Sequence, residues 1–116
     1  MNLKYIFKIL DKDEWNGAKK NGYYSGSAQD LKDGYIHFSE EGQVQETLKK
    51  HYDKRENLIL LKVHTLNLDH LVWENASNGD MYPHLYSNLD IKNVEKEFEL
   101  HLNDKEIHQL PELSSK

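Results

Sequence analysis

The pattern of apolar and polar positions along the chain predicts several β-strands. Residues 3 to 10 alternate between two faces and open the predicted fold with a strand. Residues 58 to 64, LILLKVH, form the most apolar run and predict a central strand that is buried on both faces. Residues 92 to 102 place apolar side chains on one face and charged ones on the other, which is typical of a half-exposed antiparallel strand.

Capping residues and helical spacing predict two helices between these strands. Asp11 precedes the first helix, and Glu14 lies three residues later, which is the spacing of a capping box. Asn21-Gly22 marks the end of this helix, because glycine tolerates the left-handed conformation of a helix exit. Apolar residues recur at helical spacing from about residue 40 to residue 52 and predict the second helix.

Two shorter strands and two loops complete the predicted order of elements. A strand is expected over residues 35 to 39, and another follows a turn within residues 66 to 74. Residues 23 to 34 and 75 to 90 are rich in small and polar groups, so both are predicted to be loops. This order of elements predicts an α+β fold with a small mixed β-sheet and two main helices packed on it.

The length of 116 residues suits one domain and is too short for two. We expect the domain to span residues 1 to 102 and to be followed by a tail over residues 103 to 116. Asn103 and Glu106 have the spacing to cap a short helix in this tail, which Pro111 would end.

Composition excludes several classes of protein. The chain has no Cys, so it holds neither disulfides nor a Cys-based zinc site. A net charge of -5 and a single Arg argue against a nucleic-acid partner, because such proteins concentrate positive charge. No apolar run reaches the ~20 residues that span a membrane. The N-terminus lacks the cleavage site of a signal peptide, and a cytoplasmic location is expected.

Three residues are candidates for catalysis. On the strand over residues 35 to 39, His37 lies on the face opposite the apolar side chains, where it could act as an acid or base. His84 belongs to a second polar and aromatic segment. Glu74 follows an apolar stretch, and a buried Glu beside a His would have a perturbed pKa. The alternatives are ordinary core or surface His residues and an exposed Glu.

Six further residues are candidates for ligand binding. Tyr24 and Ser27 offer hydroxyls in a loop, while Tyr82 and Tyr86 offer rings that could stack on a flat heterocycle. Ser39 and Trp73 are the other two candidates; a helix N-cap is the alternative role for Ser39, and packing at the edge of the core is the alternative for Trp73.

Two neighbouring acids and the His residues need separate interpretation. Asp30 and Asp33 are predicted to be turn residues. The seven His include no helical pair one turn apart and no HExxH motif, so no metal site is predicted. A long-range metal site made by His37, His84 and Glu74 is the remaining alternative.

Three segments together resemble the domain-of-unknown-function family 952. They are YYSGSAQDLKDGYIHFS at residues 23 to 39, LVWE at 71 to 74 and MYPHLYSNL at 81 to 89, and the resemblance extends roughly over residues 3 to 101. It implies a fold similar to that of ADP-ribosyltransferases, a split β-sheet with a cleft that binds nicotinamide dinucleotide in the transferases. A fold alone does not define a function.

Two hypotheses for function follow from these residues. One is an enzyme that acts on a nucleotide or on NAD and breaks a ribosyl bond through an oxocarbenium-like state. In that case His37 or Tyr24 would fix the ribose, and Tyr82 or Tyr86 would stack on the leaving base. Glu74 would stabilise the growing positive charge. The other is a module that binds a small molecule or a protein without chemistry, and a structural hydrogen-bond network is a third reading.

Overall fold

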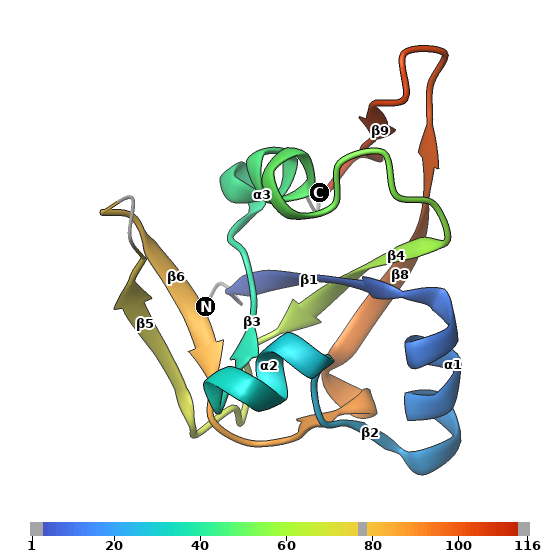
Figure 1. The fold of residues 1–116 in the computed structure, drawn as a ribbon. Helices are drawn as coiled ribbons and strands as arrows, with labels where there is room; N and C mark the ends of the chain where they lie inside the picture. The colour runs from blue at the N-terminus through green and yellow to red at the C-terminus, as the bar shows by residue number, and fades with distance from the viewer. Residues whose placement is uncertain (1–3, 77–78, 114–116) are drawn as a thin grey trace.

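The structure, a computed structural model, describes residues 4–76 and 79–113, and within them helices and strands form an α+β fold (Figure 1). The strands are β1 (Tyr5–Asp11), β2 (Tyr23–Tyr24), β3 (Ile36–His37), β4 (Leu58–His64), β5 (Leu71–Asn75), β6 (Met81–Leu85), β7 (Leu89–Asp90), β8 (Val94–Leu102) and β9 (His108–Gln109). The α-helices are α1 (Lys12–Asn21), α2 (Ala28–Asp33) and α3 (Val44–His51), and short 3₁₀ helices cover Glu41–Gln43 and Ile91–Asn93. None of the helices in these residues is long and apolar enough to cross a membrane.

The strands form three sheets with the orders β1-β4-β8-β9, β2-β7 and β3-β6-β5. Every neighbouring pair of strands in the described residues is antiparallel, so the prediction of a mixed sheet was wrong. Parallel neighbours need a crossover connection, whereas β5 and β6 follow each other directly and pair as a hairpin.

The central sheet is covered on both faces, which explains why β4 is almost entirely apolar. One face packs on α1 and on the β3-β6-β5 sheet, and the other packs on α3 and on the C-terminal segment (Figure 1). Leu60 and Leu61 point to opposite faces, and both are fully buried. The prediction of a buried central strand over residues 58 to 64 is confirmed.

The β3-β6-β5 sheet has one apolar face and one polar face. Ile36 and Leu85 lie opposite each other in the register and point into the core, where Leu71 and Trp73 pack beside them. The alternating positions point to the other face, which carries the candidate site.

Both segments predicted to be loops contain regular structure. Residues 23 to 34 hold β2 and α2, and residues 75 to 90 hold β6 and β7. The second predicted helix is split into a 3₁₀ turn and α3, with Glu40 in place of Ser39 at the N-cap. The first helix ends as predicted at Gly22, which has φ 86° and donates its N–H to Ala18 O.

The segment after Leu102 forms a hairpin instead of the short helix that was predicted. Asn103 Oδ1 accepts from the N–H groups of Lys105 and Ile107, which turns the chain and lets β9 pair with β8. Leu113 is buried beneath α3, and its carbonyl accepts from Lys62 Nζ at 3.0 Å.

Candidate functional site

A short helix, α2, positions the first half of the site. Ser27 caps it: its Oγ accepts from the Asp30 N–H at 3.1 Å, and Asp30 Oδ2 accepts from the Ser27 N–H at 2.9 Å. Ser-x-x-Asp has the spacing of a capping box, so this helix start was visible in the sequence. Ser27 therefore caps this helix, and its contact with a ligand stays a prediction.

Asp30 is a buried hub, with 2% of its surface exposed. Besides Ser27, it accepts from Lys8 Nζ at 2.9 Å and from the His37 backbone N–H at 3.2 Å, and it lies 2.6 Å from His37 Nδ1. Burial by itself would raise the pKa of Asp30, but the bonds from His37, Lys8 and Ser27 outweigh it and hold the pKa well below its usual range. The prediction that Asp30 is a turn residue was wrong.

Lys8 reaches this hub from the central sheet. It lies on β1 and is 4% exposed, so its charge depends on Asp30 for a partner. Burial lowers the pKa of Lys8, and the neighbouring Asp30 carboxylate opposes that change.

Carboxylates hold His37 at both ring nitrogens. Nδ1 lies 2.6 Å from Asp30 Oδ1, and Nε2 lies 3.0 Å from Asp33 Oδ2. Because carboxylates only accept hydrogen bonds, both contacts orient the ring and leave neither nitrogen free.

His84 faces a single carboxylate. It lies directly opposite His37 in the β3–β6 register and is 7% exposed. Its Nδ1 lies 2.7 Å from Glu74 Oε1, and the same oxygen accepts from the Tyr86 hydroxyl at 2.7 Å. Among residues 4–76 and 79–113, no hydrogen bond engages His84 Nε2.

Glu74 is half-buried and lies beside a His, which the sequence had offered as one possibility for this acid. Its side chain is 40% exposed, and hydrogen bonds from Tyr86 and His84 lower its pKa. The hydrogen bond from Tyr86 to Glu74 also raises the pKa of Tyr86 to about 12, because the phenol proton is shared with a negative charge. Tyr82 lies opposite Glu74 in the β5–β6 register and is half-buried.

Tyr35 joins the two histidines. Its ring stacks on that of His84 with centroids 4.1 Å apart, and it lies 4.6 Å from His37 and 5.2 Å from Tyr86. The two imidazoles are 5.5 Å apart. Burial raises the pKa of Tyr35. This residue was not among the predicted ligand contacts, although alternation placed it on the same face as His37.

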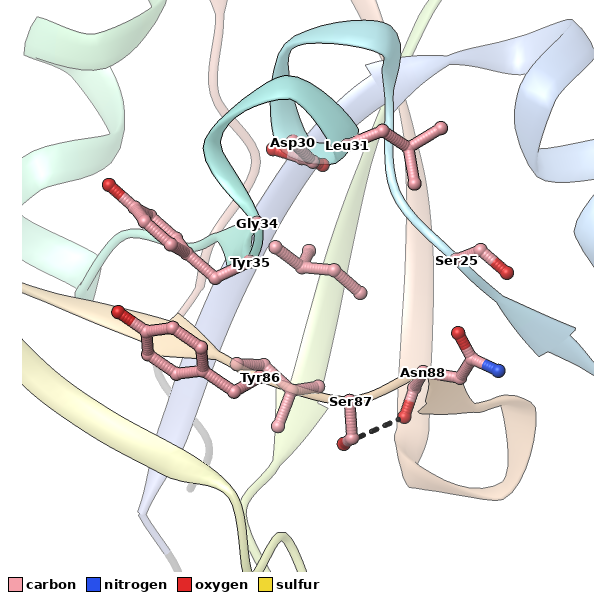
Figure 2. Close-up of a pocket in the computed structure, with 10 residues that line it drawn as sticks. Ser25, Asp30, Leu31, Gly34, Tyr35, Tyr86, Ser87 and Asn88 are labelled. Atoms are coloured by element: carbon pink, nitrogen blue, oxygen red, sulfur yellow. Dashed lines mark hydrogen bonds between the residues drawn. The ribbon is translucent and has the colours of Figure 1, made fainter.

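An open pocket of about 410 Å³ lies beside these rings. Figure 2 shows α2 along one side, the segment from Tyr86 to Asn88 along the other, and Tyr35 and Tyr86 together at one end. Neither histidine lines the pocket itself; Tyr35, which contacts both, forms part of its wall. In the part of the chain that the structure describes, no group of His, Asp and Glu could hold a metal ion.

Three predicted ligand contacts have other partners. Tyr24 is buried in the hydrophobic core, and burial raises the pKa of its hydroxyl. Ser39 is buried and its Oγ lies 3.1 Å from Thr47 Oγ1. Trp73 packs against the core and donates from Nε1 to Glu40 at 3.0 Å. Of the three, Trp73 lies on β5 and, by alternation with Glu74, points to the face of that sheet opposite the histidines.

Known proteins resemble the whole fold. The crystal structure of protein CC0527 from Caulobacter crescentus is 41% identical, with a TM-score of 0.86 over 91% of this chain and 94% of that one. The solution structure of CC0527 is 42% identical, with a TM-score of 0.81 over 94% and 93% of the two chains. No curated protein matches the chain. The family model "Protein of unknown function (DUF952)" matches residues 9–97, and the chain belongs to that family.

Proposed function

We propose that this protein is an enzyme that acts on a nucleotide or on NAD and that His84 is its general base. The observation that carries the proposal is the arrangement of His84: Nδ1 is held by Glu74, while no hydrogen bond from the residues that the structure describes engages Nε2. A histidine whose Nδ1 donates to a carboxylate presents Nε2 as the nitrogen that can take a proton.

The proposed reaction is hydrolysis or transfer at a ribosyl bond. His84 Nε2 takes the proton of water or of an acceptor hydroxyl, and the oxygen forms a bond to the anomeric carbon. The bond from that carbon to the base breaks, and its electron pair leaves with the base. Glu74 keeps the His84 ring in place and stabilises the imidazolium that forms.

The carboxylate can act in this way because it stays ionised. Its lowered pKa keeps Glu74 negative at neutral pH, so it does not serve as a proton donor. A fixed negative charge beside the site also favours the positive charge that develops on the sugar. Tyr86 and Tyr35 supply ring faces at the pocket, where a flat heterocycle could stack.

His37 takes a supporting role in this proposal. Both of its nitrogens face carboxylates, so it is less suited to proton transfer than His84. An ADP-ribosyltransferase-like fold is part of the proposal; a divided antiparallel sheet with His, Tyr and Glu side chains on one polar face supports it.

The test is to incubate the protein with NAD, NADP and common nucleotides and to measure release of the base by chromatography. We expect turnover that His84→Ala abolishes, and a loss of about 10²- to 10⁴-fold is typical for a general base. The matched control is His101→Ala, which removes a histidine on β8 whose side chain is 77% exposed.

Thermal shift measurements with the same compounds separate catalysis from binding. A ligand at 100 times its Kd should add roughly 2.7 kcal/mol of stability. Binding without turnover would mean that the protein is a non-catalytic binding module. The absence of both binding and turnover with every nucleotide tested would refute the proposal.

A further inference from the structure

A buried charge connects the central sheet to the proposed site. Lys8 is on β1, a strand whose inner five residues are all buried, and it is one of few charged residues in the core. A buried ammonium is strongly unfavourable without a close partner. Its Nζ lies 2.9 Å from Asp30 Oδ2, so the sequence tolerates Lys8 in this strand because Asp30 is there.

Both oxygens of Asp30 are occupied. Oδ2 accepts from Lys8 Nζ and the Ser27 N–H, and Oδ1 accepts from the His37 backbone N–H and lies 2.6 Å from its Nδ1. With four contacts from three parts of the chain, this carboxylate has a single orientation. It is too fully engaged to act on a substrate directly.

The order imposed on His37 continues through ring contacts. Tyr35 contacts both imidazoles, with its ring centroid 4.6 Å from that of His37 and 4.1 Å from that of His84, and the two imidazoles lie edge to face with centroids 5.5 Å apart. Aromatic pairs at such distances have preferred relative orientations, so a change in the orientation of one ring alters the preferred orientation of the next. A continuous chain of contacts therefore runs from Lys8 through Asp30, His37 and Tyr35 to His84.

We propose that Lys8 and Asp30 are positioning residues that fix the ring of His37 and, through Tyr35, the ring of His84. The inference rests on the proposed function of His84 for its meaning in catalysis. Its structural content concerns the free protein and can be tested without any substrate.

The double variant Lys8→Met/Asp30→Asn removes both charges together and leaves no buried ion unpaired, so the fold should survive. The readout is proton NMR of the imidazole N–H groups. In the natural protein, a hydrogen bond of 2.6 Å to a buried carboxylate should protect the His37 Nδ1–H from exchange and shift it downfield. In the variant its exchange should be at least about tenfold faster, because a charge-assisted bond becomes a neutral one.

A second expected effect is a change in the His84 ring signals, since Tyr35 would no longer be fixed against it. The matched control is Lys12→Met/Glu99→Gln, which removes an exposed ion pair between α1 and β8 and should leave both histidines unchanged. A purely structural role for Lys8 and Asp30 would lower the melting temperature without altering these signals in the folded protein.

If the double variant does not fold, Asp30→Glu provides the same test. It keeps the charge beside Lys8 but displaces the carboxylate by one methylene, so the His37 proton should again lose its protection. A folded variant of either kind whose His37 and His84 signals match the natural protein would overturn the inference. Altered signals in a protein that turns over no nucleotide would uphold the positioning and refute the proposed enzyme.

Discussion

The two histidine–carboxylate pairs lie side by side yet are held in opposite ways. His37 and His84 are cross-strand neighbours on β3 and β6. The partner of the first, Asp30, is 2% exposed, whereas the side chain of Glu74, the partner of the second, is 40% exposed. The carboxylate of the first pair is therefore part of the interior and that of the second is open to solvent. The rings show the reverse: the side chain of His37 is 36% exposed and that of His84 is 9% exposed.

Their partners explain the difference. Asp30 is stabilised by the buried ammonium of Lys8, which lies on β1 of the central sheet. Glu74 depends on the phenol of Tyr86, which is itself 46% exposed. A pair made of a histidine and a carboxylate can therefore hold its ring rigidly at one position and leave a ring nitrogen available for chemistry at the next.

The largest expected effect comes from removing Lys8 from its buried ion pair with Asp30. Lys8→Met leaves the Asp30 carboxylate buried without its ammonium, which should cost about 3–5 kcal/mol of the free energy of unfolding. Glu74→Gln, at the open pair, should leave the urea midpoint almost unchanged. Urea denaturation of both variants checks this contrast. A cost below about 1 kcal/mol for Lys8→Met would contradict the prediction, because an exposed ion pair contributes no more than that.

The next largest effect is a difference in how the two carboxylates contribute to stability as the pH falls. The pKa of Asp30 in the folded protein is below that in the unfolded chain, so the unfolded chain binds a proton first as the pH falls. Its stabilisation is present above the ordinary Asp pKa of about 3.9 and is lost as the pH falls toward the folded value.

The measurement is the free energy of unfolding between about pH 6 and pH 2, in the natural protein and in Lys8→Met/Asp30→Asn. The variant should lose less stability over this range. Glu74 also has a lowered pKa and so acts with the same sign, but solvent screens it and Glu74→Gln should alter the slope less. Parallel slopes for the natural protein and the double variant would contradict the prediction.

The sequence predicted the strands with clear periodicity better than those with mixed signals. The run at residues 58 to 64 and the alternation before Leu102 each matched a strand. The strand β6 was missed because Pro83 lies in its middle, and proline removes a backbone donor. In the fold this costs little, since its carbonyl still accepts from the Phe38 N–H at 3.0 Å.

The candidate site was predictable in part for the same reason. Alternation places His37 on a polar face, and the polar segment around His84 supplied its neighbour in space. Asp30 and Lys8 could not be linked from sequence, because they are 22 residues apart and their pairing depends on how α2 packs over β1. The burial of Tyr24 was not predicted, because nothing in its loop indicates it.

Removal of the Tyr35 ring, which contacts both histidines, should change the stability less than removal of the Lys8 charge. Tyr35→Leu keeps an apolar side chain but removes the stacking on His84, which should cost about 1 kcal/mol of stability. Tyr35→Phe keeps the ring and serves as the control. Chemical denaturation gives the stability, and the His84 ring protons report the lost stacking. Equal effects of the Leu and Phe variants would show that the hydroxyl matters and the ring does not.

The smallest expected effect is a titration at the open pair. The pKa of Tyr86 is raised to about 12 because its hydroxyl donates to Glu74, so deprotonation would place two negative charges together. Glu74→Gln should lower this pKa toward the ordinary value of about 10, which carbon NMR of the labelled phenol ring can follow. Glu97→Gln is the matched control, because its side chain is 41% exposed and lies on β8. A pKa near 10 for Tyr86 in the natural protein would mean that Tyr86 does not donate to Glu74. The carboxylate that holds His84 would then lack the hydrogen bond from Tyr86.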